Sequence, residues 1–371
     1  MSDTKFRVAF TLVKGIGAVR LQALLDYFGD AKSAWNASAF DLASAGLSAK
    51  LVERLLETRA GLDIDQYMDK IQAQDIQILT WDDAAYPAHL KQIDQPPPIL
   101  YLKGAITPED SWAVAIVGTR AVTAYGRQVT EEIATTLAHN GITIVSGLAR
   151  GVDAIAHSAA LKTGGRTLAV LGSGVDRIYP PEHRGLAEKI MAQGAVLSDY
   201  APGTPPESAN FPPRNRIISG LSLTVVVVEA AETSGSLITA SFAADQGRDV
   251  FAVPGNIFAP QSKGTNRLIA NGARPLLAVK DILDALDLNR NLERREVRKA
   301  LPSDPTEAAL FQLIGPEPLH VDEIRAQSGL PIERVSATLT MMELKGMVRQ
   351  VGGMQYVTVR EESAPYEIDK P

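Results

Sequence analysis

Short apolar runs alternate with amphipathic stretches along residues 112–287 of this chain. The clearest run is 224–230, TVVVVEA, whose four consecutive valines are typical of a strand buried on both faces of a parallel sheet. Helical periods lie between the runs, as in 126–140 and 153–162. This order predicts an α/β fold with a doubly wound, mostly parallel sheet. The other predicted strands are 113–117, 142–146, 167–171, 196–198 and 250–253.

The segments on either side of this region have different patterns. Residues 1–75 are predicted to form a helical module, and 76–104 a connector with strand-like runs at 76–79 and 99–102. The central domain is assigned to 105–288, followed by a charged linker at 289–303. Residues 304–360 are predicted to form a winged helix, with helices at 306–314, 321–328 and 332–345 and a hairpin at 348–359. Residues 361–371 are predicted to form a flexible tail.

Each end module poses its own functional question. The turn Gly15-Ile16-Gly17 resembles the hairpin of helix-hairpin-helix motifs, which present backbone N–H groups to phosphates. A glycine turn between two packed helices would have the same sequence, so both interpretations stay open. In the winged-helix segment, four basic residues face seven acidic ones between 303 and 359. That balance disfavours strong binding to duplex DNA and favours contact with a protein.

Composition narrows the classes of protein to consider. The 371 residues carry a net charge of −6 and contain no cysteine, which excludes disulfides and thiolate metal sites. No apolar run is long enough for a membrane span, and the first residues lack a signal-peptide pattern, so we expect a cytoplasmic protein without membrane contact. The acidic balance disfavours broad coating of duplex DNA but allows a local basic groove.

Candidate binding residues follow the predicted strands. Ligands of doubly wound sheets bind at the carboxyl ends of the strands, where glycine, serine, threonine and arginine gather in this chain. The turn Ser234-Gly235-Ser236 leads from the valine strand into a helix N-terminus, which favours anions. The candidates after the earlier strands are Gly118, Thr119, Arg120, Ser146, Gly147 and Arg150.

A second group of candidates lies just before the valine strand. Phe211, Arg214, Asn215 and Arg216 combine an aromatic ring with two guanidinium groups, and no acidic residue occurs between 211 and 222. Each residue alone could be packed or solvated, but the cluster favours a nucleotide or a nucleic-acid strand. Pro212-Pro213 favours an extended segment, which would place both arginines on one side and start a helix near Ile217.

The sequence offers little support for catalysis. It lacks the dinucleotide-binding glycine motif, the phosphate loop of Walker-type ATPases and the zinc-protease motif, so we expect no metal and no cofactor. Asp153 and His157, four apart on one predicted helix, could form an acid–base couple, although a structural pair is the more common outcome. Further carboxylate candidates are Glu229, Glu232, Asp176 and Asp199. No spacing of a nucleophile and a base stands out.

Several long motifs resemble the DNA-processing protein A family (DprA, also called Smf). The resemblance extends along nearly the whole chain, and its motifs keep one order. They are YPAHLKQIDQPPPILYLKG (86–104), VGTRAVTAYG (117–126), SGLARGVDAIAH (146–157), LGSGVDRIYPPEH (171–183), FPPRNRIISGLS (211–222), VVVEAAETSGSLITASFAADQGRDVFAVPG (226–255) and KGTNRLIANGA (263–273).

The resemblance implies an extended Rossmann-like domain, an N-terminal module resembling a sterile-alpha-motif domain, and a C-terminal winged helix. It implies a cytoplasmic, non-catalytic homodimer that binds and protects incoming single-stranded DNA and loads the RecA recombinase on it during natural transformation. The family's DNA-binding residues carry over to Arg120, the Ser146-Gly147 loop, the 211–216 segment and the turn at 234–236. They extend to Lys263.

Two other functional classes remain as alternatives. The fold and a turn beside a glutamate also resemble nucleotide-binding hydrolases of the lysine-decarboxylase-like Rossmann group. Those proteins use a P-G-G-x-G-T-x-x-E turn, whereas this chain has EAAETSGS at 229–236. A protein scaffold acting through the winged helix is the third class.

Overall fold

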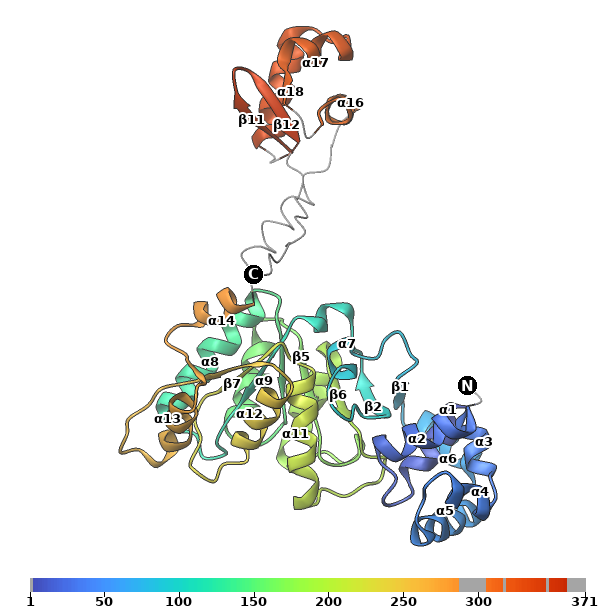
Figure 1. Ribbon diagram of the computed structural model, residues 1–371. Coiled ribbons are helices and arrows are strands. Elements are labelled where there is room, and N and C mark those ends of the chain that lie inside the picture. The colour runs from blue at the N-terminus through green and yellow to red at the C-terminus, as the bar shows by residue number, and fades with distance from the viewer. Residues whose placement is uncertain (1–2, 287–304, 316–317, 345–346, 359–371) are drawn as a thin grey trace, which may run out of the picture. The chain divides into compact units, whose positions relative to one another are not determined.

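The computed structural model describes residues 3–286, 305–315, 318–344 and 347–358. They belong to two compact units, Met1–Ile282 and Leu283–Pro371, which are drawn in Figure 1. The predicted linker at 289–303, the predicted tail at 361–371 and Lys345 lie outside the described residues.

The first unit begins with a bundle of short helices, as the sequence predicts. Phe10, Trp35 and Leu55 lie in its core, where the rings of Phe10 and Trp35 meet edge to face at 5.1 Å. At Gly15 φ is +106°, a conformation that favours glycine, and an added Cβ would lie 2.8 Å from a methyl carbon of Leu51. The helices are α1 (Thr4–Thr11), α2 (Ala18–Phe28), α3 (Ala31–Asn36), α4 (Ala39–Ser44), α5 (Ala49–Gly61) and α6 (Ile64–Ala73).

A nine-stranded sheet forms the centre of the first unit, in the order β1-β2-β6-β5-β4-β3-β7-β8-β9. The strands from β6 to β9 in that order run parallel, which confirms the predicted doubly wound sheet, whereas β1 and β2 are antiparallel to their neighbours. The strands are β1 (Gln77–Thr80), β2 (Ile99–Gly104), β3 (Ala113–Val117), β4 (Thr143–Ser146), β5 (Thr167–Val170), β6 (Ala195–Ser198), β7 (Thr224–Val227), β8 (Asp249–Ala252) and β9 (Arg274–Pro275).

The structure corrects the interpretation of residues 76–104 as a connector. This segment supplies β1, β2 and the short helix α7 (Ala88–Lys91), and β2 pairs with β6. Leu90 and Leu100 lie in the main core, and the Tyr86 hydroxyl donates to the carbonyl oxygen of Pro97 at 2.7 Å. The segment therefore adds two antiparallel strands to the sheet of the first unit.

Helices cover both faces of the sheet (Figure 1). Helices α8 (Ala124–His139), α9 (Val152–Lys162) and α10 (Arg184–Gln193) follow β3, β4 and β5, and α8 packs on α9. Helix α11 (Phe211–Gly220) precedes β7, α12 (Ser236–Asp245) follows it, and these two pack on each other. The remaining elements are α13 (Lys263–Ala270), η1 (Pro108–Ser111), η2 (Pro181–His183), η3 (Ser208–Asn210) and η4 (Pro260–Ser262), and α14 (Val279–Ala285) spans the boundary between the two units.

The direction of the crossovers reverses between β3 and β7. Helix α8 leads from β3 to β4 on one side of this pair, and α12 leads from β7 to β8 on the other. Because such crossovers are right-handed, α8 and α12 lie on opposite faces of the sheet. A crevice forms at the carboxyl ends of strands where the order reverses in this way.

The second unit has the elements of a winged helix. Its sheet has the order β10-β12-β11, and Leu310, Ile324 and Leu339 are fully buried in its core. The predicted helices and hairpin are confirmed. They are α16 (Pro305–Leu313), β10 (Leu319–His320), α17 (Val321–Ser328), α18 (Ile332–Leu344), β11 (Val348–Gly352) and β12 (Gln355–Thr358).

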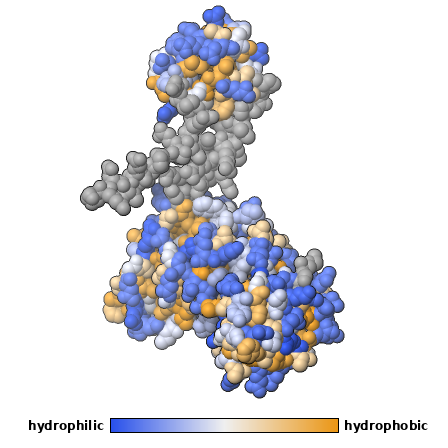
Figure 2. Space-filling view, turned by 45° about the vertical axis from the view of Figure 1, so that its right-hand side comes forward, coloured by the Kyte–Doolittle hydropathy of each residue, from blue (hydrophilic) through white to orange (hydrophobic). Residues whose placement is uncertain are grey.

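On the face drawn in Figure 2, hydrophilic and hydrophobic residues are interspersed over the first unit. None of the helices within the described residues is long and apolar enough to cross a bilayer.

Candidate functional site

A cleft of about 550 Å³ opens at the carboxyl ends of β3 and β7, where the crossovers reverse. We call it the switch-point cleft. Its main lining segments are the loop after β3, the start of α11 and the turn into α12, and Ala149, Asp153 and Tyr179 also line it. The predicted site residues along it are Gly118, Thr119, Arg120, Phe211, Arg214, Asn215, Ser234, Gly235 and Ser236.

The loop after β3 is held close to its neighbours. Thr119 donates its backbone N–H to the carbonyl oxygen of Glu229 at 2.7 Å, which joins the ends of β3 and β7. An added Cβ at Gly118 would lie 2.7 Å from a methyl carbon of Val152, so only glycine fits there without a shift. Arg120 follows directly, with an exposed side chain whose guanidinium carbon lies 5.9 Å from the ring centre of Phe211.

Helix α11 begins at Phe211, and this corrects the predicted extended segment. Pro212 and Pro213 occupy the first turn, where a missing N–H costs no helical hydrogen bond and the fixed φ suits a helix. On a helix, residues two apart point to different sides. Arg214 and Arg216 therefore cannot share one face, as the extended segment would require.

Arg214 lies buried at the edge of the cleft, 5.8 Å from the ring centre of Phe211. Its guanidinium group donates to the carbonyl oxygen of Gly147 at 2.8 Å and to that of Val170. Burial lowers the pKa of Arg214 to about 10, while the nearby Asp153 acts in the opposite direction. Arg214 thus ties α11 to the ends of β4 and β5 and lends positive potential to the cleft.

Asp153 holds the loop after β4 from the other side. Its carboxylate accepts the backbone N–H groups of Gly147 at 3.1 Å and Ala149 at 3.3 Å. Burial raises the pKa of Asp153, and the charge of Arg214 opposes that rise. The loop after β4 is therefore fixed by one acidic and one basic side chain, both buried.

Arg216 points away from the cleft. It forms an ion pair with Asp199 at 2.7 Å and donates to the carbonyl oxygen of Gln95 at 2.8 Å. Burial raises the pKa of Asp199, against the effect of Arg216. These contacts tie α11 to the end of β6 and correct the expectation that Arg216 faces the ligand.

Four further predicted residues lie around the cleft. Gly147 and Arg150 line a smaller adjoining pocket together with Arg120, Phe211 and Arg214. The Arg150 side chain also pairs with Glu182 at 2.5 Å. Ser146 is fully buried and bonds the carbonyl oxygen of Ile116, and Lys263 is exposed at the start of α13, so neither lines these hollows.

Tyr179 was missed by the sequence interpretation. Its ring lies 5.6 Å from that of Phe211, at an interplanar angle of 36°, and it lines both the cleft and the adjoining pocket. It lies in the long loop after β5, at the carboxyl end of a strand, where ligands of doubly wound sheets bind. An aromatic residue in such a loop is the sequence feature that could have identified Tyr179 as a site residue, as it did Phe211.

Three of the carboxylate candidates, Glu229, Asp176 and Asp199, hold neighbouring groups in place. Glu229 accepts the backbone N–H of Thr123 at 2.9 Å and its hydroxyl at 2.5 Å, just before α8 begins. Asp176 accepts the backbone N–H of Gly203 at 2.8 Å. Within the described residues, no three histidine, aspartate or glutamate side chains gather as metal ligands would. Glu232 is exposed and lies outside the cleft lining.

The proposed acid–base couple does not form. His157 Nδ1 contacts the Thr167 hydroxyl at 2.6 Å, while Asp153 holds the loop after β4. Burial lowers the pKa of His157 to about 3, so the ring is neutral near pH 7.

The start of α12 completes the cleft. The hydroxyl groups of Ser234 and Ser236 lie 2.8 Å apart, and Asn215 donates its side-chain amide to the carbonyl oxygen of Gly235 at 3.2 Å. The turn is thereby fixed with the positive end of a ten-residue helix at the cleft. Combined with guanidinium groups and aromatic rings, this arrangement suits a phosphate-bearing ligand with planar bases.

Two family models and several named proteins match this chain. Residues 77–287 match the family model "DNA recombination-mediator protein A", and 294–354 match "DprA winged helix domain". Protein Smf of Synechocystis sp. is 38% identical over 392 residues, covering 96% of this chain and 98% of that protein. DNA processing protein DprA of Streptococcus pneumoniae is 44% identical over 201 residues, covering 54% of this chain and 71% of that protein.

Two solved structures are similar as well. The X-ray structure of DNA processing protein A from Streptococcus pneumoniae has a TM-score of 0.67 and 35% identity, covering 76% of this chain and 97% of that chain. A structure of the Helicobacter pylori protein has a TM-score of 0.52 and 32% identity, covering 57% and 97%. Its description refers to a unique single-stranded DNA binding mode.

Proposed function

Because this chain belongs to the DNA recombination-mediator protein A family, we propose that it binds single-stranded DNA in the switch-point cleft. One observation carries the proposal: the guanidinium carbons of Arg120 and Arg214 lie 5.9 and 5.8 Å from the ring centre of Phe211. A base can stack on such a ring while its phosphates meet the cations. The similar Helicobacter pylori structure, described for its single-stranded DNA binding, supports the same ligand class.

The shape of the cleft favours a single strand over a duplex. Stacking on Phe211 needs a base whose face is free, and in a duplex that face is covered by its neighbours. A groove with a few local cations in a chain of net charge −6 suits a short contact rather than broad coating of a duplex.

The proposal extends to the steps after DNA binding. In it, the protein protects incoming single strands in the cytoplasm, acts as a homodimer and loads the RecA recombinase during natural transformation, without catalysing a reaction itself. Family membership supports this wider role. Glu229 is engaged with Thr123, and Glu232 lies outside the cleft lining, which supports binding over the hydrolase alternative.

A titration of labelled single-stranded and duplex oligonucleotides of the same sequence tests the binding step. We expect the single strand to bind more tightly, and Arg120→Ala to weaken it while Arg184→Ala, an exposed residue at the start of α10, does not. Equal affinity for both DNA forms, or an unaffected Arg120→Ala variant, would overturn the assignment. Release of ribose phosphate from a nucleoside monophosphate would instead support the hydrolase.

The wider role has its own measurements. Light scattering across protein concentrations should give the mass of a dimer. Assembly of RecA filaments on single strands should start sooner when this protein is present. A monomer mass throughout, or unchanged RecA assembly, would remove that part of the proposal and leave the binding step intact.

A further inference from the structure

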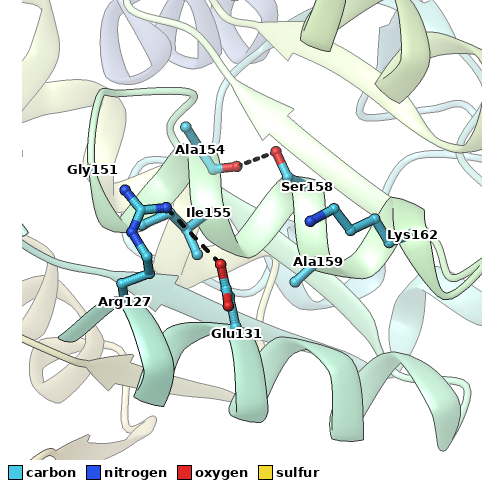
Figure 3. Close-up of a pocket in the computed structure, with 8 residues that line it drawn as sticks. All are labelled: Arg127, Glu131, Gly151, Ala154, Ile155, Ser158, Ala159 and Lys162. Atoms are coloured by element: carbon cyan, nitrogen blue, oxygen red, sulfur yellow. Dashed lines mark hydrogen bonds and ion pairs between the residues drawn. The ribbon is translucent and has the colours of Figure 1, made fainter. Parts of the chain in front are cut away.

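A second hollow, of about 390 Å³, lies between the parallel helices α8 and α9. We call it the α8–α9 groove. Figure 3 shows the guanidinium group of Arg127 and the ammonium group of Lys162 toward opposite sides, with Glu131 and Ser158 between them. Its other lining residues are Gly151, Ala154, Ile155 and Ala159.

The cations of this groove are weakly engaged. Arg127 and Glu131 approach only to 3.9 Å, and both side chains are about half exposed, at 57% and 49%. An exposed pair of this kind contributes little to stability, so an incoming anion can compete for the guanidinium group. Within the part of the chain that the structure describes, Lys162 forms no ion pair. The Ser158 hydroxyl donates to the carbonyl oxygen of Ala154 at 2.7 Å.

The groove adjoins the switch-point cleft through one loop. Of three consecutive residues, Ala149 lines the cleft, Arg150 lines the small pocket and Gly151 lines the α8–α9 groove. Gly151 presses against the loop after β3, since an added Cβ would lie 2.7 Å from the carbonyl oxygen of Arg120. The loop 149–151 therefore contributes to the lining of all three hollows, with the half-exposed Arg150 side chain between the cleft and the groove.

We infer that the α8–α9 groove holds backbone phosphate of the same single DNA strand that occupies the switch-point cleft, with Arg127 and Lys162 as the cations that meet it. This inference rests on the proposed function of the cleft. A strand longer than the cleft must continue beyond it, and the groove reached along the loop 149–151 holds two weakly engaged cations. The groove has no aromatic lining residue, so it would contact the backbone and not read bases.

The inference makes strand length the decisive variable. Titrations use the full chain and a length series of oligothymidylates, from the shortest that binds wild type to lengths where affinity no longer rises. The variant Arg127→Gln/Lys162→Gln should bind the shortest oligomer as wild type does. It should bind the longest ones roughly three- to tenfold more weakly, as expected for two solvent-exposed charge contacts.

Salt dependence and a gain of affinity give independent readouts. Two lost phosphate contacts should reduce the log–log salt slope for long oligomers by about 1.4, at about 0.7 per contact on a single strand. Glu131→Gln removes the competing carboxylate and should strengthen the binding of long oligomers only. Matched controls are Lys189→Gln and Glu188→Gln on α10, which line none of these hollows and should change neither quantity.

The outcomes separate the two proposals. If wild type binds no oligothymidylate of any length, both the proposed function and the groove fail. If wild type binds but the double variant loses affinity equally at all lengths, or at none, the groove inference is overturned and the cleft stands. Unchanged thermal unfolding of the double variant, expected for exposed side chains, assigns any length-dependent loss to the groove.

Discussion

The guanidinium group of Arg214 donates to the carbonyl oxygen of Gly147 at 2.8 Å, across 67 positions of the sequence. The approach is so close that an added Cβ at Gly147 would lie 2.8 Å from the guanidinium group. Arg214 also bonds the carbonyl oxygen of Val170, so one buried cation joins α11 to the ends of β4 and β5. The shape of the switch-point cleft therefore depends on this side chain as much as its charge does.

Arg214→Ala should destabilise the fold as well as weaken DNA binding. It leaves the carbonyl oxygens of Gly147 and Val170 without this donor. It also removes the cation that counteracts the rise in the pKa of buried Asp153. Leaving a buried hydrogen-bonding group without its partner typically costs about 1–3 kcal/mol of unfolding free energy. Arg214→Lys should recover part of that loss, because an ammonium group keeps the charge but not the planar donor geometry. Denaturant unfolding of both variants measures it, and wild-type stability of Arg214→Ala would contradict the structural role.

Arg120→Ala should weaken single-strand binding and leave stability unchanged. The Arg120 side chain is exposed, so the fold loses no buried contact. A charged hydrogen bond contributes about 1.5–3 kcal/mol at most here, since solvent screens it, and one lost phosphate contact lowers the log–log salt slope by about 0.7. Arg216→Ala is the contrasting variant, because it leaves Asp199 unpaired and should mainly lower the free energy of unfolding. Binding titrations at several salt concentrations, combined with unfolding curves, distinguish the two arginines.

Phe211→Ala should weaken binding with little change in salt slope. Loss of a stacking ring costs about 1–3 kcal/mol per base and removes no charge. Tyr179→Phe keeps the ring beside Phe211 and should bind almost as wild type, whereas Tyr179→Ala should weaken binding in the same salt-independent way. If Phe211→Ala changes the slope as much as Arg120→Ala does, the division between stacking and charge is wrong.

The sheet and the general position of the site could be predicted from sequence because both depend on local patterns. The valines of β7 mark a buried strand, and the glycine and serine turns after β3 and β7 mark the carboxyl edge. The valine strand is shorter than predicted, since it ends at Val227 and Ala230 bonds the carbonyl oxygen of Gln261 instead. Such a departure depends on a partner 31 positions away, which no local pattern contains.

The orientation of α11 could not be predicted for a similar reason. Pro212 and Pro213 fit both an extended segment and the first turn of a helix, so the local sequence does not decide between them. The helix is favoured by tertiary contacts, since it sends Arg214 to the ends of β4 and β5 and Arg216 to Asp199. Ser146 illustrates the same limit, because its position at a strand end is as predicted while its hydroxyl points inward to Ile116.

His157 should make the fold less stable as the pH falls, and a neutral substitute should remove that dependence. Burial, reinforced by the nearby His183 and Arg214, lowers its pKa from 6.5 to about 3. Between those values the unfolded chain binds a proton that the folded protein refuses, so the His157 contribution is fully present above pH 6.5 and is lost as the pH falls toward 3. Burial raises the pKa values of Asp153 and Asp199, which works in the opposite direction, so the pH dependence of wild type alone is uninformative.

The informative quantity is the difference in unfolding free energy between wild type and His157→Gln, measured by urea unfolding at a series of pH values. That difference should be constant near neutrality and shift below pH 6.5 in favour of the variant, by at most about 1.4 kcal/mol per pH unit. Parallel curves for the two proteins down to mildly acidic pH would show that the ring is protonated, or hydrated, in the fold.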